Sequence, residues 1–432
     1  MYIIEKLTII SIIFSMIYIV FNLKVGAIIT LLFLLYIFIK KDYIYLIILI
    51  LFYQSYINSD VLEKDKIYNL KIRKIGEKIE VLKINKKLSK EEYNIKTYDE
   101  INNGVFYTIS KIEKKYKNIV YLDNYEIKES NLNKYRYFLY KNIEKLDLEY
   151  NTENFVKAII LGEKTSLDNS IKNKFNNIGA SHILVISGFH IGLIILLLLK
   201  IAEFLKFSYR QKYFFTFILL SIYVFLVMFT PSVFRAYIMG SFILFSNIFY
   251  EKNEIRKSYC FSMILNLINN PFILRNISFQ MSYIALFAII YSYNYYNKFI
   301  GNKYFKLILL SIIIQIYLMP IFLYYFKSIY IFSFIANVVI LSYAIFIIPA
   351  IFILYFINIL SFNFFGILIR YIIERMYHSL YGIVTLFSKI PLMKIDIKYA
   401  STIFLMIFTY FLIFFIEYEV RKIIKSNLTK NI

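Results

Sequence analysis

The sequence predicts a polytopic α-helical membrane protein with a small external β domain inserted after its N-terminal spans. Two observations lead to this prediction. Of the 432 residues, 59% are hydrophobic, and apolar runs recur from one end of the chain to the other, which exceeds what a soluble core requires. Residues 58–150 interrupt this pattern with dense charge and short alternating runs.

The first 57 residues contain three apolar runs, at 7–21, 25–39 and 43–57, and each is a candidate membrane span. The first run lacks a small-residue cleavage site and is followed at once by the second, so we expect a retained helix, not a signal peptide. Lys40 and Lys41 separate the second and third runs. Because positive loops stay inside, the segment after residue 57 is predicted to lie outside.

Residues 58–135 are the predicted extracellular domain. Residues 78–84 and 104–109 alternate between polar and apolar side chains, which is the period of half-buried strands. The sequence Asn102-Asn103-Gly104 is a turn signal. Strands of this kind fit a small OB-like β-barrel, a fold that often binds single strands or sugars, although the pattern does not specify the barrel.

The pattern turns helical near residue 132, so residues 136–180 are predicted to form amphipathic, juxtamembrane helices. Outside residues 58–150 the chain holds 30 basic and 12 acidic residues. Much of the basic excess lies in short loops at 200–212, 252–257 and 298–306. All three loops are cytoplasmic if they connect spans near 183–199, 212–230, 233–249, 258–270, 277–296 and 307–326.

Residues 181–420 therefore form the predicted transmembrane domain. The segment at 258–270 is short and fits a span or a re-entrant helix. Two further spans near 330–360, an ambiguous amphipathic stretch at 366–389 and a last span at 400–417 complete the domain. A basic tail at 421–432 is predicted to be cytoplasmic.

The most informative stretch is residues 178–191, which read IGASHILVISGFHI. His182, Ser187 and His190 lie here at the start of an apolar segment. Polar groups at membrane depth usually face a bundle interior or a water-filled cavity, and the glycines allow a broken helix that lines such a cavity. The alternative is an ordinary helix start with Ser181 as its N-cap.

Four other polar residues are candidates for a translocation pathway: Glu163, Arg235, Gln280 and Asn337. Each has a structural alternative. Glu163 fits an exposed position on a juxtamembrane helix. Arg235 follows a helix start at Pro231 and could snorkel to the interface or bind helix ends or Glu163. The two amides could hold helices together.

Catalysis is a weaker interpretation. Ser187 and His190 are three residues apart, so they share a helix face, as a membrane serine hydrolase would require. The Gly-x-Ser-x-Gly elbow is missing, however, and no acid lies nearby in the sequence to orient His190. One cysteine and three histidines leave little for a zinc site, and no phosphate-binding glycine loop occurs. We therefore expect no metal and no cofactor.

Several ordered motifs resemble those of the ComEC family of competence proteins. They are Leu161-Gly162-Glu163, Gly179-Ala180-Ser181-His182, Ile186-Ser187-Gly188-Phe189-His190-Ile191-Gly192, Pro231-Ser232-Val233-Phe234-Arg235-Ala236, Asn270-Pro271 leading to Ser278-Phe279-Gln280-Met281-Ser282, and Pro320 leading to Ala336-Asn337. They cover about 160–350, and the soluble insert is similar to the family's OB-like domain in position and strand content.

The resemblance implies an inner-membrane channel that carries single-stranded DNA into the cytoplasm during natural transformation. It implies single-stranded DNA and membrane lipid as partners, together with a DNA receptor protein and a cytoplasmic ATP-driven motor. The resemblance leaves open whether the protein forms a homo-oligomer. The alternatives are an intramembrane Ser/His hydrolase and a transporter of another anionic polymer or solute.

The sequence departs from the family pattern at its C-terminus. Many members carry a metallo-β-lactamase-like domain proposed to degrade the non-transported strand, whereas this chain ends at Ile432 without a His-rich motif. We therefore expect no enzymatic activity. A separate nuclease, another substrate or a reduced role would then explain the difference.

Overall fold

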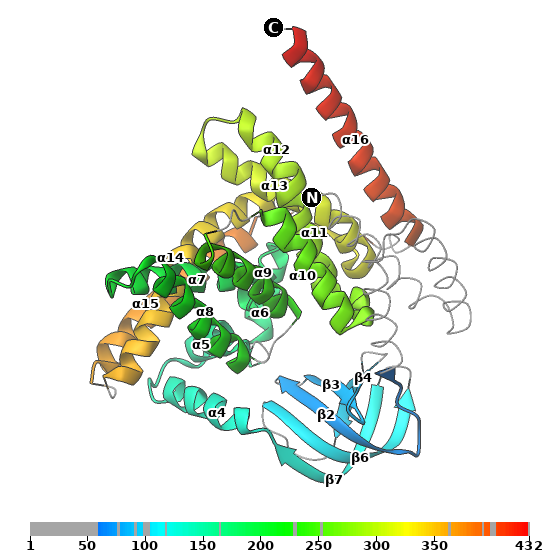
Figure 1. The fold of residues 1–432 in the computed structure, drawn as a ribbon, viewed down its shortest axis with the longest axis vertical. Coiled ribbons are helices and arrows are strands. Elements are labelled where there is room, and N and C mark those ends of the chain that lie inside the picture. The colour runs from blue at the N-terminus through cyan, green and yellow to red at the C-terminus, as the bar shows by residue number, and fades with distance from the viewer. Residues whose placement is uncertain are drawn as a thin grey trace. The chain divides into compact units, whose positions relative to one another are not determined.

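The computed structural model describes residues 59–430, apart from gaps at 76–77, 90–92, 98–103, 117–118, 164–165, 228–230, 251–253, 362–363, 391–392 and 398–402. The three N-terminal apolar runs and most of the Asn102-Asn103-Gly104 turn signal lie outside the described residues. The described part is mostly helical, with one sheet near its N-terminal end (Figure 1).

The sheet contains seven strands. They are β1 (Ser59–Asp60), β2 (Ile67–Ile75), β3 (Lys78–Ile84), β4 (Lys87–Ser89), β5 (Asn94–Thr97), β6 (Gly104–Tyr116) and β7 (Ile119–Glu129). The strands predicted at 78–84 and 104–109 are present as β3 and the first half of β6. Alternation identified them because every second side chain, such as Ile79 and Phe106, enters the buried core.

The pairing of the strands forms a closed circuit. In spatial order, β6, β2, β3 and β5 are antiparallel neighbours, which is a Greek-key arrangement. β7 then pairs antiparallel with β6 and parallel with β5, so it closes the circuit. The enclosed core holds Leu62, Tyr68, Leu70, Ile72, Ile79, Ile84, Tyr93, Ile95, Phe106, Ile112, Val120 and Leu122.

Helices follow the sheet directly. They are α4 (Asn131–Glu144), α5 (Tyr150–Leu161), α6 (Asn169–Asn177), η1 (Ser181–Leu184), α7 (Gly188–Phe204), α8 (Tyr209–Leu226), α9 (Pro231–Ile248), α10 (Ile255–Asn269), η2 (Pro271–Arg275) and α11 (Ile277–Phe287). As predicted, Pro231 begins a helix, since proline is well tolerated in a first turn.

The remaining elements are η3 (Ala288–Tyr293), a π-helix, α12 (Asn294–Tyr296), η4 (Asn297–Phe299), α13 (Lys303–Ile321), η5 (Phe322–Phe326), β8 (Ser328–Ile329), α14 (Ser333–Leu360), α15 (Gly366–Ser388), β9 (Ile395–Asp396) and α16 (Ile403–Lys430). The prediction of two spans near 330–360 is wrong, because α14 is one helix of 28 residues that continues past Pro349.

Two described segments are long and apolar enough to cross a bilayer, Lys303–Phe326 and Ser333–Leu360, and Ser232–Ile248 is a shorter apolar helix. The chain divides into two compact units. The first contains the sheet, α4, α5 and α7 to α10. The second contains α6, η1, most of α11, α13 and α16. Two clusters of polar side chains, one in each unit, contain candidate functional residues.

Candidate functional site

The first cluster lies where α7 begins. The alternative in which Ser181 caps this helix is wrong, because Ser181 starts the short η1 helix and Ser187 precedes Gly188, the first residue of α7. Ser187 has the extended backbone of an N-cap, with φ −121° and ψ 176°. The long helix therefore starts six residues later than that alternative predicts, after the second serine of the stretch.

His190 completes this cap. Its Nδ1 accepts the backbone N–H of Ser187 at 3.4 Å and lies 3.1 Å from the Ser187 hydroxyl. The imidazole is fully buried. In a capping box the residue at the third helical position, usually Glu or Gln, reaches back to the N-cap, and here His190 takes that place. The contact between Ser187 and His190 is thus explained by the start of the helix.

Arg235 brings a positive charge to the same place. It lies one turn into α9 and is buried, with 5% of its side chain exposed. A Cβ atom built on Gly188 would lie only 2.9 Å from its Nη2 atom. The hydroxyl of Ser232 donates to the carbonyl of Ile186 at 3.1 Å. The first turns of α7 and α9 are therefore in contact, and glycine at 188 leaves room for the guanidinium.

Glu163 lies beside this contact but has a different partner. It follows Gly162, whose left-handed backbone (φ 75°) ends α5 and where an added Cβ atom would lie 3.3 Å from Cδ1 of Ile186. The Glu163 carboxylate lies 3.9 Å from Nη2 of Arg136, and both side chains are buried. Burial raises the pKa of the Glu163 carboxyl above its ordinary value, and Arg136 opposes that rise. Glu163 is thus a buried residue, not an exposed one.

Sequence reasoning missed Arg136. Its guanidinium also donates to the carbonyls of Leu161 and Leu226, at 3.1 and 3.2 Å, and so satisfies the last carbonyl groups of α5 and α8. In the sequence Arg136 is an arginine between two tyrosines of α4, and its neighbours do not indicate which helix ends its guanidinium contacts.

The other three predicted pathway residues belong to the second unit. His182 lies in η1 with an exposed side chain. Gln280 donates to the Tyr325 hydroxyl at 3.1 Å, which is the helix-linking role given as its alternative. Asn337 is partly buried in the second turn of α14. The first cluster therefore unites Ser187, His190 and Arg235, with Glu163 adjacent.

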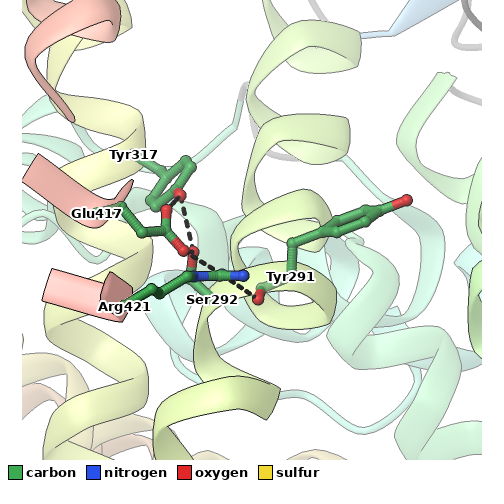
Figure 2. Close-up of polar contacts among 5 residues, drawn as sticks. All are labelled: Tyr291, Ser292, Tyr317, Glu417 and Arg421. Carbon is green, nitrogen blue, oxygen red and sulfur yellow. Dashed lines mark hydrogen bonds and ion pairs between the residues drawn. The ribbon is translucent and has the colours of Figure 1, made fainter. Parts of the chain in front are cut away.

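The second cluster lies on α16 (Figure 2). Glu417 accepts hydrogen bonds from Ser292 Oγ, at 2.7 Å, from Tyr317 and from Arg421. Arg421 also donates to the Tyr291 carbonyl at 2.7 Å. Ser292 and Tyr317 are buried, and their hydroxyl oxygens lie 2.7 Å apart. Four polar side chains from three segments thus form one network around a carboxylate.

The π-helix η3 supplies Ser292 and Tyr291 to this network. A π-turn adds a residue to the helix and frees a carbonyl from regular helical bonding, and such turns are frequent at functional sites. The carbonyl of Tyr291 is the one that Arg421 uses. In the described part of the chain, no group of three or more His, Cys, Asp or Glu residues is placed to hold a metal ion.

Comparison with known proteins identifies the family. The family model described as Competence protein matches residues 159–422, which is more than half of the chain. The chain belongs to this competence-protein family. The ComEC-type resemblance of the sequence motifs is therefore confirmed, and the matched region contains both polar clusters and excludes the sheet.

One relative is similar to part of this chain. ComE operon protein 3 of Bacillus subtilis (strain 168) is 27% identical over 173 residues, which are 40% of this chain and 22% of that protein. This chain thus matches less than a quarter of the length of that relative. No solved structure matches the chain.

Proposed function

We propose that this competence-family protein is a multi-pass protein of the bacterial cytoplasmic membrane that carries single-stranded DNA inward during natural transformation. The observation that supports this most directly is the family match over residues 159–422, because it contains the α7–α9 contact with its buried Arg235. The alternative cargo is another anionic polymer, and competition for uptake between DNA and other polyanions distinguishes the two.

The α7–α9 contact is electrostatically suited to a polyanion. The N-terminus of a helix carries partial positive charge on its free backbone N–H groups, and here the Arg235 guanidinium lies against the first residue of α7. The N-terminus of α7 and the Arg235 guanidinium together favour a negatively charged group beside them. Passing phosphates would supply that charge transiently, without base-specific contacts.

A membrane hydrolase is the second candidate, because the Ser187 hydroxyl lies 3.1 Å from a histidine ring nitrogen. In serine hydrolases the serine contacts Nε2 and an acid orients Nδ1. In this chain Nδ1 faces Ser187 and also accepts its backbone N–H. This arrangement favours a helix cap, so we propose that Ser187 and His190 shape the route without catalysis.

Substitution of Ser187 separates the two candidates. Ser187→Ala removes both the cap and the hydroxyl and should cost about 1 kcal/mol of stability. Ser187→Asn keeps a capping oxygen but has no nucleophile, so we expect it to retain DNA uptake at normal membrane level. Uptake of labelled DNA into a nuclease-protected form is the measurement. Loss of uptake in both variants, with both at normal level, would favour the hydrolase.

We also propose that the closed sheet is an OB-type domain that holds the incoming strand. The five-strand Greek-key circuit supports this assignment. Cross-strand pairing aligns Lys83, Lys71, Tyr107 and Lys128 in one row over β3, β2, β6 and β7. Tyr107 is 49% exposed and Lys71 lies over its ring. Lysines beside an exposed aromatic ring suit phosphates and stacked bases.

This row gives a salt-dependence prediction. Replacing Lys71, Lys83 and Lys128 together with Gln should weaken single-stranded DNA binding and reduce the slope of log K against log salt by about 2, since each contact contributes about 0.7. Fluorescence anisotropy of the full chain in detergent measures both. The control replaces Lys64, Lys66 and Lys114, three exposed lysines outside the row, and should change neither. Equal losses in both triple variants would contradict the assignment.

We propose that partner proteins share the role. A DNA receptor protein would deliver the strand, a cytoplasmic ATP-driven motor would supply energy, and a separate nuclease would degrade the other strand. We propose no catalytic step for this chain.

A further inference from the structure

Helix α4 has a mixed pattern of burial, with polar side chains among its buried residues and aromatic side chains among its exposed ones. Its buried side chains include the polar Asn133, Arg136 and Asn142. Its exposed side chains include Tyr135, Tyr137 and Phe138, which are 68%, 57% and 55% exposed. A surface helix normally buries its apolar side chains and exposes its polar ones, so the outward face of α4 calls for an apolar or amphipathic environment.

The polar contacts of α4 fix which face points outward. Asn133 pairs through both amide atoms with the backbone of Val105 in β6, at 3.0 and 3.2 Å. Arg136 binds the carbonyls of Leu161 and Leu226. Tyr355 donates to the carbonyl of Leu139 at 2.8 Å. Because these bonds tie α4 to four other elements, rotation of the helix to bury its aromatic residues would break them.

The outward face also carries positive charge. Lys134 and Lys141 are exposed on it, Lys145 is exposed in the turn directly after the helix, and Lys141 lies over the Tyr137 ring, 4.8 Å from its centroid. Lys134 and Lys141 are seven residues apart, which is about two helical turns, and the rings of Tyr137 and Phe138 lie between them at three- and four-residue spacing, so these side chains share one face of the helix. Aromatic rings and lysines together are the composition enriched where a protein meets lipid headgroups.

The position of α4 points to the same environment. Arg136 binds the carbonyl of Leu226, the last residue of α8. The exposed side chains of α8 include Phe214, Ile218, Ile222 and Phe225, spaced to form an apolar stripe. The stripe therefore ends where α4 contacts α8, and α4 lies at the boundary of an apolar surface.

We propose that α4 lies in the lipid–water interface, with Tyr135, Tyr137 and Phe138 among the headgroups and Lys134, Lys141 and Lys145 directed to anionic lipid phosphates. This inference rests on the proposed membrane placement of the helical part. Its consequence is that lipid anchors the sheet, because Asn133 joins α4 to β6. The competing occupant is single-stranded DNA, which also binds lysines and aromatic rings.

The test places an environment-sensitive fluorophore on single cysteines of the full chain in a Cys260→Ser background. Phe138→Cys reports on the outward face of α4, Ile218→Cys on the α8 stripe and Glu113→Cys on the exposed side of β6. The protein is reconstituted into vesicles of zwitterionic and anionic phospholipid. Quenching is measured with a nitroxide on the headgroup, with a nitroxide deep in the acyl chain and with aqueous iodide.

We expect the headgroup nitroxide to quench position 138 several-fold more than iodide does, the acyl-chain nitroxide to quench position 218, and iodide to quench position 113. If the acyl-chain nitroxide does not quench position 218, the proposed membrane placement of the helical part is wrong. Success at 218 with iodide quenching at 138 would overturn the interfacial position alone. Protection of 138 only after single-stranded DNA is added would assign the face to nucleic acid, and shielding from all quenchers would assign it to protein; both would overturn the proposal.

Discussion

Arg235→Gln should reduce DNA transport into the cytoplasm to background, while the protein stays in the membrane and external DNA binding is retained. Arg235 is buried against the first residue of α7, so its loss removes the positive charge from the proposed route. Arg235→Lys keeps the charge but loses the planar fork of donors, and we expect it to keep part of the transport. Nuclease-protected label, membrane protein level and surface-bound label measure the three properties.

The glycines of α7 provide a matched geometric test of the same site. Gly188→Ala places a methyl group 2.9 Å from Nη2 of Arg235, so the guanidinium must move. Gly192→Ala meets nothing within 4 Å and should stabilise the helix by about 0.5–1 kcal/mol. We expect Gly188→Ala to lose transport in the way Arg235→Gln does, and Gly192→Ala to retain it. Normal transport in Arg235→Gln and Gly188→Ala at normal level would show that this contact maintains the fold only.

Local signals predicted local features well. Pro231 identified the start of α9, and polar–apolar alternation identified β3 and part of β6, because each depends on neighbouring residues alone. The N-cap of α7 was harder, since Ser181 and Ser187 are both serines close to an apolar run. The choice depends on His190, whose capping role is not the usual Glu or Gln.

Contacts between distant residues could not be read from the sequence. The parallel pairing of β5 with β7 closes the circuit of paired strands, and no sequence pattern specifies it. In the sequence, Arg136 is one basic residue of a helix. Only the structure shows that it donates to the carbonyls of Leu161 and Leu226, at the ends of two other helices. Glu417 was the first charged residue after an apolar run, and its contact with Ser292 spans 125 residues of sequence.

Glu417 and Tyr317 should show strong energetic coupling. The carboxylate of Glu417 accepts from Tyr317, Ser292 and Arg421, and Tyr317 is buried. A hydrogen bond to a charged group contributes about 1.5–3 kcal/mol, and a buried group left without its partner carries a further desolvation cost. We therefore expect Glu417→Gln, Tyr317→Phe and the double variant to give a coupling free energy of about 1–3 kcal/mol.

The measurement is the free energy of unfolding of the full chain in a mixed-micelle denaturant titration, made for all four proteins of the cycle. Glu419→Gln is the matched control, because it removes the same charge from the same helix two residues away and should be additive with Tyr317→Phe within about 0.5 kcal/mol. If the network holds α16 to η3 and α13, trypsin should also cleave after Lys422 faster in Glu417→Gln than in Glu419→Gln. Additive free energies in both cycles, with equal cleavage rates, would mean that apolar packing alone holds the helix.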